Sequence, residues 1–536
     1  MTDLLTPLDG WLNVQQDLSA VERFSQAHDV GLGVERYRDR LPATPPGPGQ
    51  QYGFEVDLDA CTGCKACVAA CHSLNGLEED ETWRKVGALH AGVDGAVEAR
   101  GSVTVTSACH HCVEPACMDG CPANAYEKDP VTGIVRHLDD ACIGCSYCTL
   151  TCPYEVPTYQ PSLGIVRKCD MCSDRLAEGE APACVQGCPQ GAITIALVDT
   201  AELVASVRVA EPPRLVPSAP TSDLTVPTTR YRSTVPVPES WVATDRSSIH
   251  PSAGHAPLAL MLVLTQVAVG MTVAAGWIAR SPSVGHAGAD ALGLAGLATG
   301  LVALAASTLH LGRPLLAWRA VLGLRRSWLS REIVAFGAFA AGGAGRFVAD
   351  LAGAPAWIET TAGAVGVIGG LAGVACSAQL YAVTGRRWWR LPATTARFGG
   401  TALLGGACGS AAVLALADPT AARPLVPSLL AVAAVGLALS VLGPLVPLWV
   451  DAHRSDPSPD LAATARLLTH DLRDRHLVRL ATAGVTALLL AGAAAAPGES
   501  GIVLAVAGLV VLVGEHQDRR LFFLASVAPR MPGSPR

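Results

Sequence analysis

The sequence predicts an α+β, cysteine-rich domain followed by an all-α polytopic membrane domain of about eight transmembrane helices, on three observations. Sixteen of the 18 cysteines fall between Cys61 and Cys188, and long apolar runs alternate with arginine-rich connectors from Ala256 onward. Residues 1–200 carry 13 Lys and Arg against 28 Asp and Glu, whereas residues 251–536 carry 21 Arg against 13 Asp and Glu. This asymmetry is typical of a soluble domain on a membrane anchor. The chain shows no basic stretch with interleaved aromatics, so we expect no nucleic-acid partner.

The sixteen cysteines form four groups of four. The first and third groups follow C-x2-C-x2-C-x3-C, the spacing that wraps a short loop around a cubane iron–sulfur cluster. Three closing cysteines precede a proline, at Pro122, Pro153 and Pro189. We therefore predict a ferredoxin-like tandem 4Fe-4S domain with four [4Fe-4S] clusters. The groups are Cys61, Cys64, Cys67 and Cys71; Cys109, Cys112, Cys117 and Cys121; Cys142, Cys145, Cys148 and Cys152; Cys169, Cys172, Cys184 and Cys188.

The ferredoxin pattern also implies which cysteines share a cluster. In two-cluster ferredoxins, the fourth cysteine of each run binds the other cluster. The expected ligand sets therefore cross between groups. They are Cys61, Cys64, Cys67 and Cys188; Cys169, Cys172, Cys184 and Cys71; Cys109, Cys112, Cys117 and Cys152; Cys142, Cys145, Cys148 and Cys121.

Other uses of these cysteines are disfavoured. Zinc ribbons place two pairs at longer separations than four cysteines within eleven residues. Disulfides are disfavoured because cysteines so close in tight loops make poor bridges and the N-terminus shows no secretory signal. No C-x-x-C-H motif for covalent haem occurs. Cys376 and Cys408 lie in apolar runs and are expected to be small core residues.

Composition divides the chain into five segments. Residues 1–50 are an N-terminal extension, whose stretch from Leu12 to His28 is either an amphipathic docking helix for a partner or a solvated tail. Residues 51–200 hold the clusters. Residues 201–255 are rich in Pro, Ser and Thr, which suits an extended linker. Residues 256–526 form the membrane anchor, and residues 527–536 form a C-terminal tail.

Eight apolar runs are candidate membrane spans. Most reach the roughly 20 residues that a helix needs to cross the bilayer, although the last is short. Beyond Gln266, Gln379 and Arg346, these runs contain almost no polar or charged residues that would serve a redox-driven pump. The runs lie near residues 256–279, 290–309, 332–352, 360–383, 398–417, 424–450, 477–496 and 500–516.

The distribution of arginines between the loops predicts the orientation of the chain in the membrane. With eight spans, both termini share one side of the membrane. The even-numbered loops and the C-terminal tail on that side hold 18 of the 21 arginines, and the opposite side holds Arg280 and Arg423. The positive-inside rule then places the cluster domain on the cytoplasmic side of the cell inner (plasma) membrane.

His310, at the end of the second run, is the candidate quinone-site residue. An ionisable side chain at the lipid boundary is a functional candidate, and imidazole can carry the proton that accompanies quinone chemistry. The alternative is a histidine satisfied by interfacial water or lipid phosphate. Apart from His516, we expect no other histidine close to a span, and therefore no b-type haem.

The motifs carry a family resemblance. Residues 52–195, with Cys61–Cys67, Cys142–Cys148 and Arg167–Cys172, resemble the four-cluster subunits of DMSO reductase family molybdopterin oxidoreductases. Residues 256–525 resemble the eight-helix anchor of DMSO reductase, through His310–Pro314 and Ser327–Glu332. The chain looks like a fusion of the two subunits.

The resemblance implies a function. A separate molybdopterin (bis-MGD) catalytic subunit would exchange electrons with menaquinone or ubiquinone, and the residue matching His310 is implicated in menaquinol binding. Some relatives carry Trp in the third cysteine group and hold a [3Fe-4S] cluster, whereas Cys145 here predicts four cubanes. The alternatives are a cytoplasm-facing complex resembling sulfite dehydrogenase that delivers electrons to quinone, a redox-driven pump, and a redox-sensing scaffold.

Overall fold

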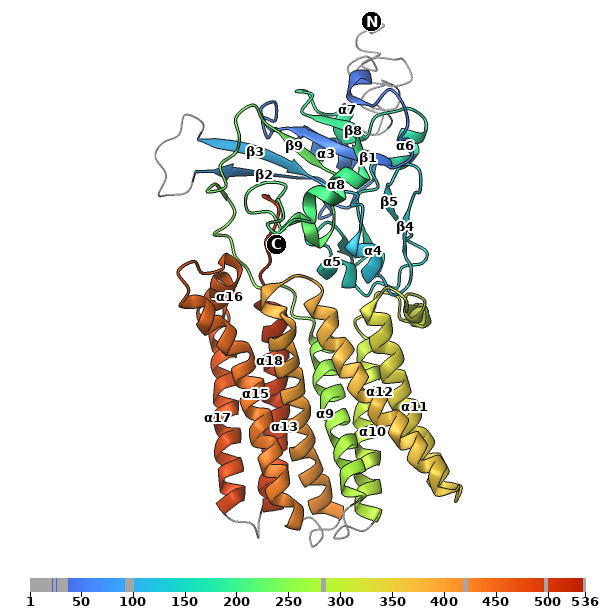
Figure 1. The fold of residues 1–536 in the computed structure, drawn as a ribbon, viewed down its shortest axis with the longest axis vertical. Helices are drawn as coiled ribbons and strands as arrows, with labels where there is room; N and C mark the ends of the chain where they lie inside the picture. Colours follow the sequence, from blue (N-terminus) through green and yellow to red (C-terminus); the bar gives the residue numbers. More distant parts are fainter. Residues whose placement is uncertain are drawn as a thin grey trace, which may run out of the picture.

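The computed structural model describes residues 22, 26, 37–91, 101–280, 286–417, 423–495 and 500–533. A domain of short strands and helices sits on one end of a bundle of long helices (Figure 1). The predicted fold class is therefore confirmed. The proposed amphipathic helix from Leu12 to His28 lies almost entirely outside the described residues.

Two small sheets and two hairpins frame the cysteine-rich domain. One sheet has the order β8-β1-β9, formed by Ile193–Asp199, Gln50–Asp57 and Arg230–Arg232. The other has the order β10-β2-β3, formed by Val242–Ala243, Lys85–His90 and Ser102–Ser107. The two hairpins are β4-β5 and β6-β7. Their strands are Tyr126–Lys128 and Val135–His137, and Thr158–Gln160 and Ile165–Arg167.

Short helices between these strands lie beside the cysteines of all four groups. All six have at most nine residues, and five of them begin next to a cysteine or contain one, so these five serve as local supports for the thiols. The sixth, α8 (Thr200–Val207), follows β8 and is capped by Asp199, whose side chain accepts a hydrogen bond from the Glu202 backbone N–H at 2.8 Å. The five are α3 (Ala66–Leu74), α4 (Ala116–Gly120), α5 (Tyr147–Thr151), α6 (Ser173–Ala177) and α7 (Ala183–Gln186).

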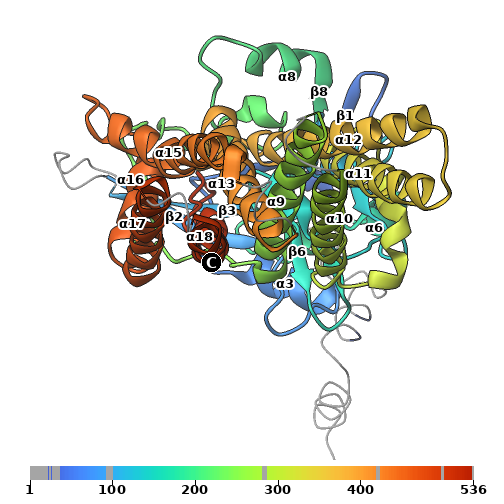
Figure 2. The same cartoon turned by 90° about the horizontal axis from the view of Figure 1, so that it is seen from below.

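Eight helices of the described part of the chain are long and apolar enough to span a membrane. The last of them has 25 residues, so it is longer than its apolar run indicated. Seen from below, α15, α16 and α17 lie at one end of the bundle and α10, α11 and α12 at the other (Figure 2). The helices are α9 (Ala256–Ile278), α10 (His286–Thr308), α11 (Trp328–Leu351), α12 (Ala356–Ala382), α13 (Leu391–Ala417), α15 (Val426–Ala452), α17 (Arg473–Ala495) and α18 (Ser500–Leu524). A shorter helix, α16 (Pro459–Thr469), connects α15 to α17.

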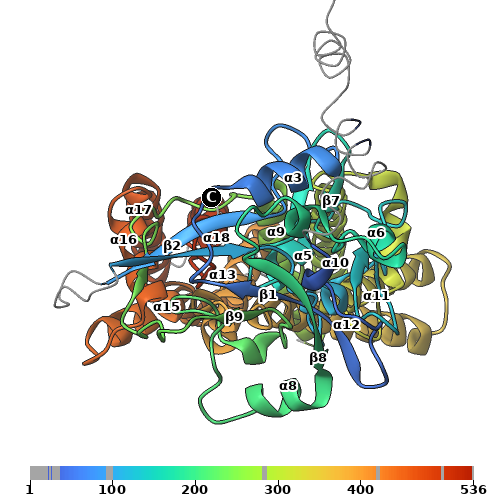
Figure 3. The same cartoon turned by 90° about the horizontal axis from the view of Figure 1, so that it is seen from above.

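The structure differs from the expected linker over residues 201–255. Its strand β9 pairs in parallel with β1, and β10 pairs with β2. Trp241 is 3% exposed and packs in the core of the cluster domain. The segment follows the surface of that domain before it enters α9, because its prolines permit extended backbone that can add to sheet edges (Figure 3).

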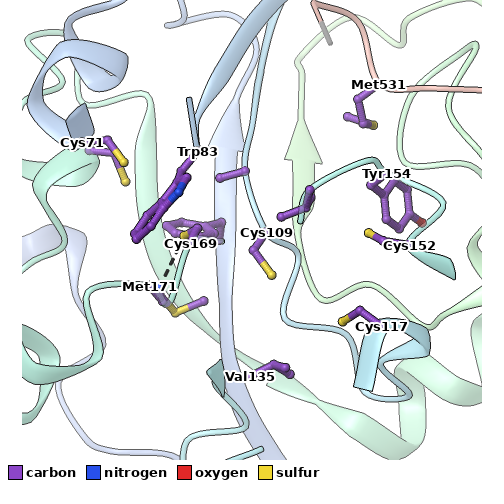
Figure 4. Packing of buried hydrophobic residues seen from close by; sticks show 14 of the residues in the cluster. Cys71, Trp83, Cys109, Cys117, Val135, Cys152, Tyr154, Cys169, Met171 and Met531 are labelled. Atoms are coloured by element: carbon purple, nitrogen blue, oxygen red, sulfur yellow. Dashed lines mark hydrogen bonds between the residues drawn. The ribbon is translucent and has the colours of Figure 1, made fainter. Parts of the chain in front are cut away.

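The C-terminal tail also differs from expectation. Met531 is 1% exposed and belongs to the core of the cluster domain, where it lies near Cys152 and Tyr154 (Figure 4). A Cβ added to Gly87 on β2 would come within 2.2 Å of the Gly533 backbone nitrogen, so strand and tail are in direct contact. The two ends of the anchor, α9 and α18, are therefore both tied to the cluster domain.

The expectation of almost no charge within the spans was wrong. Helix α13 begins at Leu391 and α18 continues to Leu524, beyond the apolar runs from which the spans were predicted. These added turns bury Arg397, Asp518 and Arg519 inside the bundle. Because the added turns are polar in sequence, hydropathy alone placed them outside the spans. Three other buried charges, Glu332, Arg479 and Glu515, lie within the predicted runs and were overlooked there.

Candidate functional site

Left-handed backbone residues shape the two C-x2-C-x2-C loops. In the first loop, Gly63 has φ of 73° and Lys65 has φ of 61°. In the loop that begins at Cys142, Gly144 has φ of 69° and Ser146 has φ of 56°. These residues reverse the chain direction between successive cysteines, and a helix that carries the third cysteine begins directly after Lys65 and after Ser146. Each loop therefore curls around one point, as a cluster-binding loop requires.

Three of the predicted ligand sets each line one cavity. Each cavity contains three cysteines of one group and the closing cysteine of another, which is the crossed arrangement that the ferredoxin pattern implied. Figure 4 shows Cys109, Cys117 and Cys152 facing a common space. The cavities hold Cys61, Cys64, Cys67 and Cys188; Cys109, Cys112, Cys117 and Cys152; and Cys121, Cys142, Cys145 and Cys148.

The structure also brings the fourth set together. Cys71 lies within electrostatic range of Cys172 and Cys184, and Cys169 lies within range of Cys71 and Cys184. Cys64 is exposed at the protein surface, whereas Cys169 and Cys184 are buried. The first set therefore lies nearest to solvent.

Two buried cations lie between the sets. Arg84 is 1% exposed, donates a hydrogen bond to Thr106 Oγ1 at 3.3 Å, and lies within electrostatic range of Cys67 and Cys184, which belong to two neighbouring sets. Lys168 Nζ lies 3.8 Å from Cys109 Sγ and 2.9 Å from the Cys169 carbonyl oxygen. Positive charge at these points favours the more negative, reduced state of a bound iron–sulfur cluster.

The connector between α10 and α11, residues 309–327, packs against the third cysteine loop, which begins at Cys142. The Gly312 N–H donates to the Gly144 carbonyl at 3.3 Å, and the Arg313 N–H donates to the Ile143 carbonyl at 3.1 Å. A Cβ on Gly312 would lie 2.1 Å from the Gly164 carbonyl oxygen, so this contact admits only glycine. The connector also meets the chain next to Cys121, where the Gly323 N–H donates to the Pro122 carbonyl at 2.7 Å. The cavity of the Cys142 loop therefore lies directly against the membrane domain.

His310 stands two residues before this contact. It is half-buried, and its Nδ1 has no hydrogen-bond partner among the described residues. Burial lowers the pKa of the His310 side chain. A hydrogen bond to the Ser307 backbone raises this pKa to a smaller extent, and the charge of nearby His255 lowers it again. The imidazole is therefore neutral near pH 7 and able to accept a proton.

The expectation that only His310 and His516 lie close to a span was wrong, because His255 directly precedes α9.

Sequence reasoning also missed Glu332. It is 4% exposed on α11 and accepts a hydrogen bond from Ser377 on α12. Tyr147, which lies between Cys145 and Cys148, enters this part of the bundle and donates to the Leu380 carbonyl at 2.7 Å. Tyr147 and Glu332 are within electrostatic range of one another. A buried carboxyl group in a span was the available signal, since such groups usually serve a function.

Comparison with known proteins agrees with this two-part structure. Residues 102–197 match the 4Fe-4S dicluster domain family, and residues 252–524 match the family of the DMSO reductase anchor subunit (DmsC). The B subunit of anaerobic dimethyl sulfoxide reductase from Escherichia coli K12 is 38% identical over 154 residues, which cover 28% of this chain and 75% of the relative.

Other relatives come from different enzyme systems. The hydrogenase-2 operon protein HybA of Escherichia coli O157:H7 is 37% identical over 172 residues, covering 28% of this chain. The formate dehydrogenase iron-sulfur subunit of Haemophilus influenzae is 34% identical over 170 residues, covering 29% of this chain. The matches span about half of these two relatives, 52% and 54%.

The cysteine loops, the eight long helices and these matches together describe a multi-pass membrane protein with an iron–sulfur domain of the 4Fe-4S type. The chain belongs to the family of DMSO reductase anchor subunits, and in the same polypeptide it joins to that anchor an iron–sulfur part related to the B subunit of anaerobic dimethyl sulfoxide reductase.

Proposed function

We propose that this chain moves electrons between a separate molybdopterin catalytic subunit and the quinone pool. The contact between Gly312 and Gly144 is the observation that carries the proposal, because it joins the connector that begins at His310 to a cluster-binding loop. Electron transfer from quinone needs a short path, and this contact supplies one. The 38% identity to the B subunit of a DMSO reductase supports a catalytic partner of the molybdenum type.

We propose that the four crossed cysteine sets each hold one [4Fe-4S] cluster, which supplies a one-electron carrier when bound. One thiolate per iron requires four cysteines for each cubane, and each cavity described above offers four. Arg84 and Lys168 supply positive charge between adjacent sets, and the exposed position of Cys64 suits exchange of electrons with a partner docked there.

We propose that quinone, either menaquinone or ubiquinone, binds beside His310. The unpaired Nδ1 of His310 can hydrogen-bond a quinone oxygen and accept its proton. His255 lies within electrostatic range of His310 and can take part in the same proton exchange. Glu332 provides a second buried proton-carrying group on the cluster-facing part of α11.

The match to a DMSO reductase anchor favours electron flow from quinol to an S- or N-oxide. The test is to purify the tagged complex from membranes, measure its molybdenum content, and supply each substrate in turn. Quinol oxidation by DMSO supports this direction. Reduction of a quinone analogue by sulfite as the sole donor would instead show the sulfite dehydrogenase direction. Absence of a molybdenum subunit would contradict the proposed partner.

We also propose that the cluster domain faces the cytoplasm, because 18 of the 21 arginines after residue 250 lie towards that side. Reporter fusions at the C-terminus test this orientation. A cytoplasmic reporter should be active there, whereas activity of a periplasmic reporter alone would reverse the orientation.

A further inference from the structure

Five buried charges link the cluster-facing ends of α13, α17 and α18. Their side chains are at most 7% exposed. Arg397 Nε lies 3.1 Å from Asp518 Oδ2, Arg479 Nη2 lies 2.7 Å from Glu515 Oε1, and Arg519 Nη1 lies 2.5 Å from Asp518 Oδ2. Three guanidinium groups face two carboxylates, so one positive charge is left over. An uncompensated buried charge is costly, which calls for an anion.

Of the three arginines, Arg397 is the one whose guanidinium group is most available to bind an anion. Arg519 is already enclosed, because it donates to Gln266 Oε1 at 2.8 Å and to Thr401 Oγ1 at 2.6 Å. The terminal nitrogens of Arg397 donate no hydrogen bond to any residue in the described ranges. Its guanidinium carbon lies 4.5 Å from the ring centre of Trp388. Trp388 is 5% exposed, and its indole N–H has no partner among the described residues.

These free donors line one pocket. Arg397, Trp388, Ser440, His476, Arg479 and Asp518 all contribute to its wall. Two of the donors are unused, and the pocket lies near the membrane surface, since α13 begins only six residues before Arg397. The open space in this pocket is only about 20 Å³, so an anion would sit at its mouth and direct its oxygen atoms towards Arg397 and Trp388 Nε1, from which they can accept hydrogen bonds.

An apolar groove continues from this pocket between α15 and α17. Val441 lines both, and the groove extends over Leu430 to Leu442 on α15 and Ala483 to Ala494 on α17. Its volume is about 660 Å³, which lies within the usual range for ligand sites. The charged end is at the membrane surface and the apolar end lies deeper in the bundle, so the site is amphipathic along the membrane normal.

We propose that the pocket and groove bind one anionic phospholipid. Its phosphodiester would accept hydrogen bonds from Arg397 and Trp388, and an acyl chain would fill the groove between α15 and α17. The leftover positive charge favours an anionic headgroup over an uncharged quinone or a zwitterionic lipid. The groove between α15 and α17 lies at the other end of the bundle from α10, after which the connector with His310 begins (Figure 2).

The test uses the intact chain, purified in mild detergent and studied by native mass spectrometry with added phosphatidylglycerol or phosphatidylcholine. We expect one retained phosphatidylglycerol. Ala487→Leu, which fills the exposed groove, should lower its occupancy about tenfold, the effect of displacing roughly two methylene groups. Ala364→Leu, at an exposed position on α12 outside the groove, is the matched control and should leave occupancy unchanged.

Arg397→Gln separates the headgroup from the acyl-chain contribution, and it should abolish the preference for phosphatidylglycerol. If this variant fails to fold, the comparison of Ala487→Leu with Ala364→Leu still tests the proposed lipid site. Equal retention of the two lipids by the wild-type protein would overturn the proposal, as would equal occupancy in Ala487→Leu and Ala364→Leu. Retention of a quinone mass that Ala487→Leu removes would also overturn it, in favour of a second quinone site.

Discussion

Removing the positive charge of Lys168 should lower the reduction potential of the cluster that we assign to the Cys109 set. Lys168 is 3% exposed, and its Nζ lies 3.8 Å from Cys109 Sγ. Lys168→Met keeps most of the side-chain volume and removes the charge. The reduced cluster then loses an attractive interaction, so its midpoint potential falls.

The size of the shift follows from Coulomb's law. For a charge about 6 Å from the cluster centre and an effective dielectric constant of about 20, the interaction is roughly 3 kcal/mol. Since about 1.4 kcal/mol corresponds to about 59 mV for one electron, the shift is about 120 mV. The cluster of the Cys169 set should shift less, because Lys168 approaches that set through the Cys169 carbonyl oxygen, at 2.9 Å. The other two clusters should shift least, because the thiols nearest to Lys168 belong to the Cys109 and Cys169 sets.

The assay is a potentiometric titration followed by EPR on the purified protein. Lys128→Met is the matched control. Lys128 Nζ donates to the Cys112 carbonyl at 3.1 Å and to the Val113 carbonyl at 2.7 Å, but the residue is only half-buried. Solvent therefore screens its charge, and its removal should shift the same cluster by less than half as much. Equal shifts in the two variants, or no shift in Lys168→Met, would refute the electrostatic reasoning.

Three further predictions concern the route to quinone. His310→Gln should abolish quinone-linked turnover and leave all four cluster signals intact in EPR; surviving turnover would remove His310 from the quinone site. Cys145→Trp should convert one cubane to a [3Fe-4S] centre, and an unchanged iron content and EPR spectrum would contradict the ligand sets. Gly312→Ala should destabilise the protein by about 1–3 kcal/mol in thermal unfolding, because the new Cβ would lie 2.1 Å from a carbonyl oxygen. Gly337→Ala, with no atom within 4 Å of the added Cβ, should change stability far less.

The features set by local sequence could be predicted. The C-x2-C-x2-C loops follow from cysteine spacing, and a glycine in each loop supplies the left-handed turn, as at Gly63 and Gly144. The spans follow from apolar length, because a helix must be about 20 residues long to cross the bilayer. Both signals are contained within a few neighbouring residues.

The features set by distant contacts could not be predicted. The segment expected to be a linker has a composition typical of extended chain, but its strand β9 gains order only by pairing with β1, which lies about 175 residues earlier. Met531 is buried by residues far from it in sequence. Arg397 looked like an interfacial charge, because its acidic partner Asp518 becomes adjacent only when α13 and α18 pack together.

The most direct test of the central claim is electron transfer from the clusters to quinone in the purified protein. The protein would be reduced with dithionite under anaerobic conditions, freed of excess reductant and mixed rapidly with a water-soluble quinone analogue, while cluster absorbance is followed. Rapid reoxidation of the wild-type protein, with much slower reoxidation of His310→Gln at equal iron content, is the predicted result. Equal rates in the two proteins, or no reoxidation of the wild-type protein, would contradict electron exchange with quinone at His310.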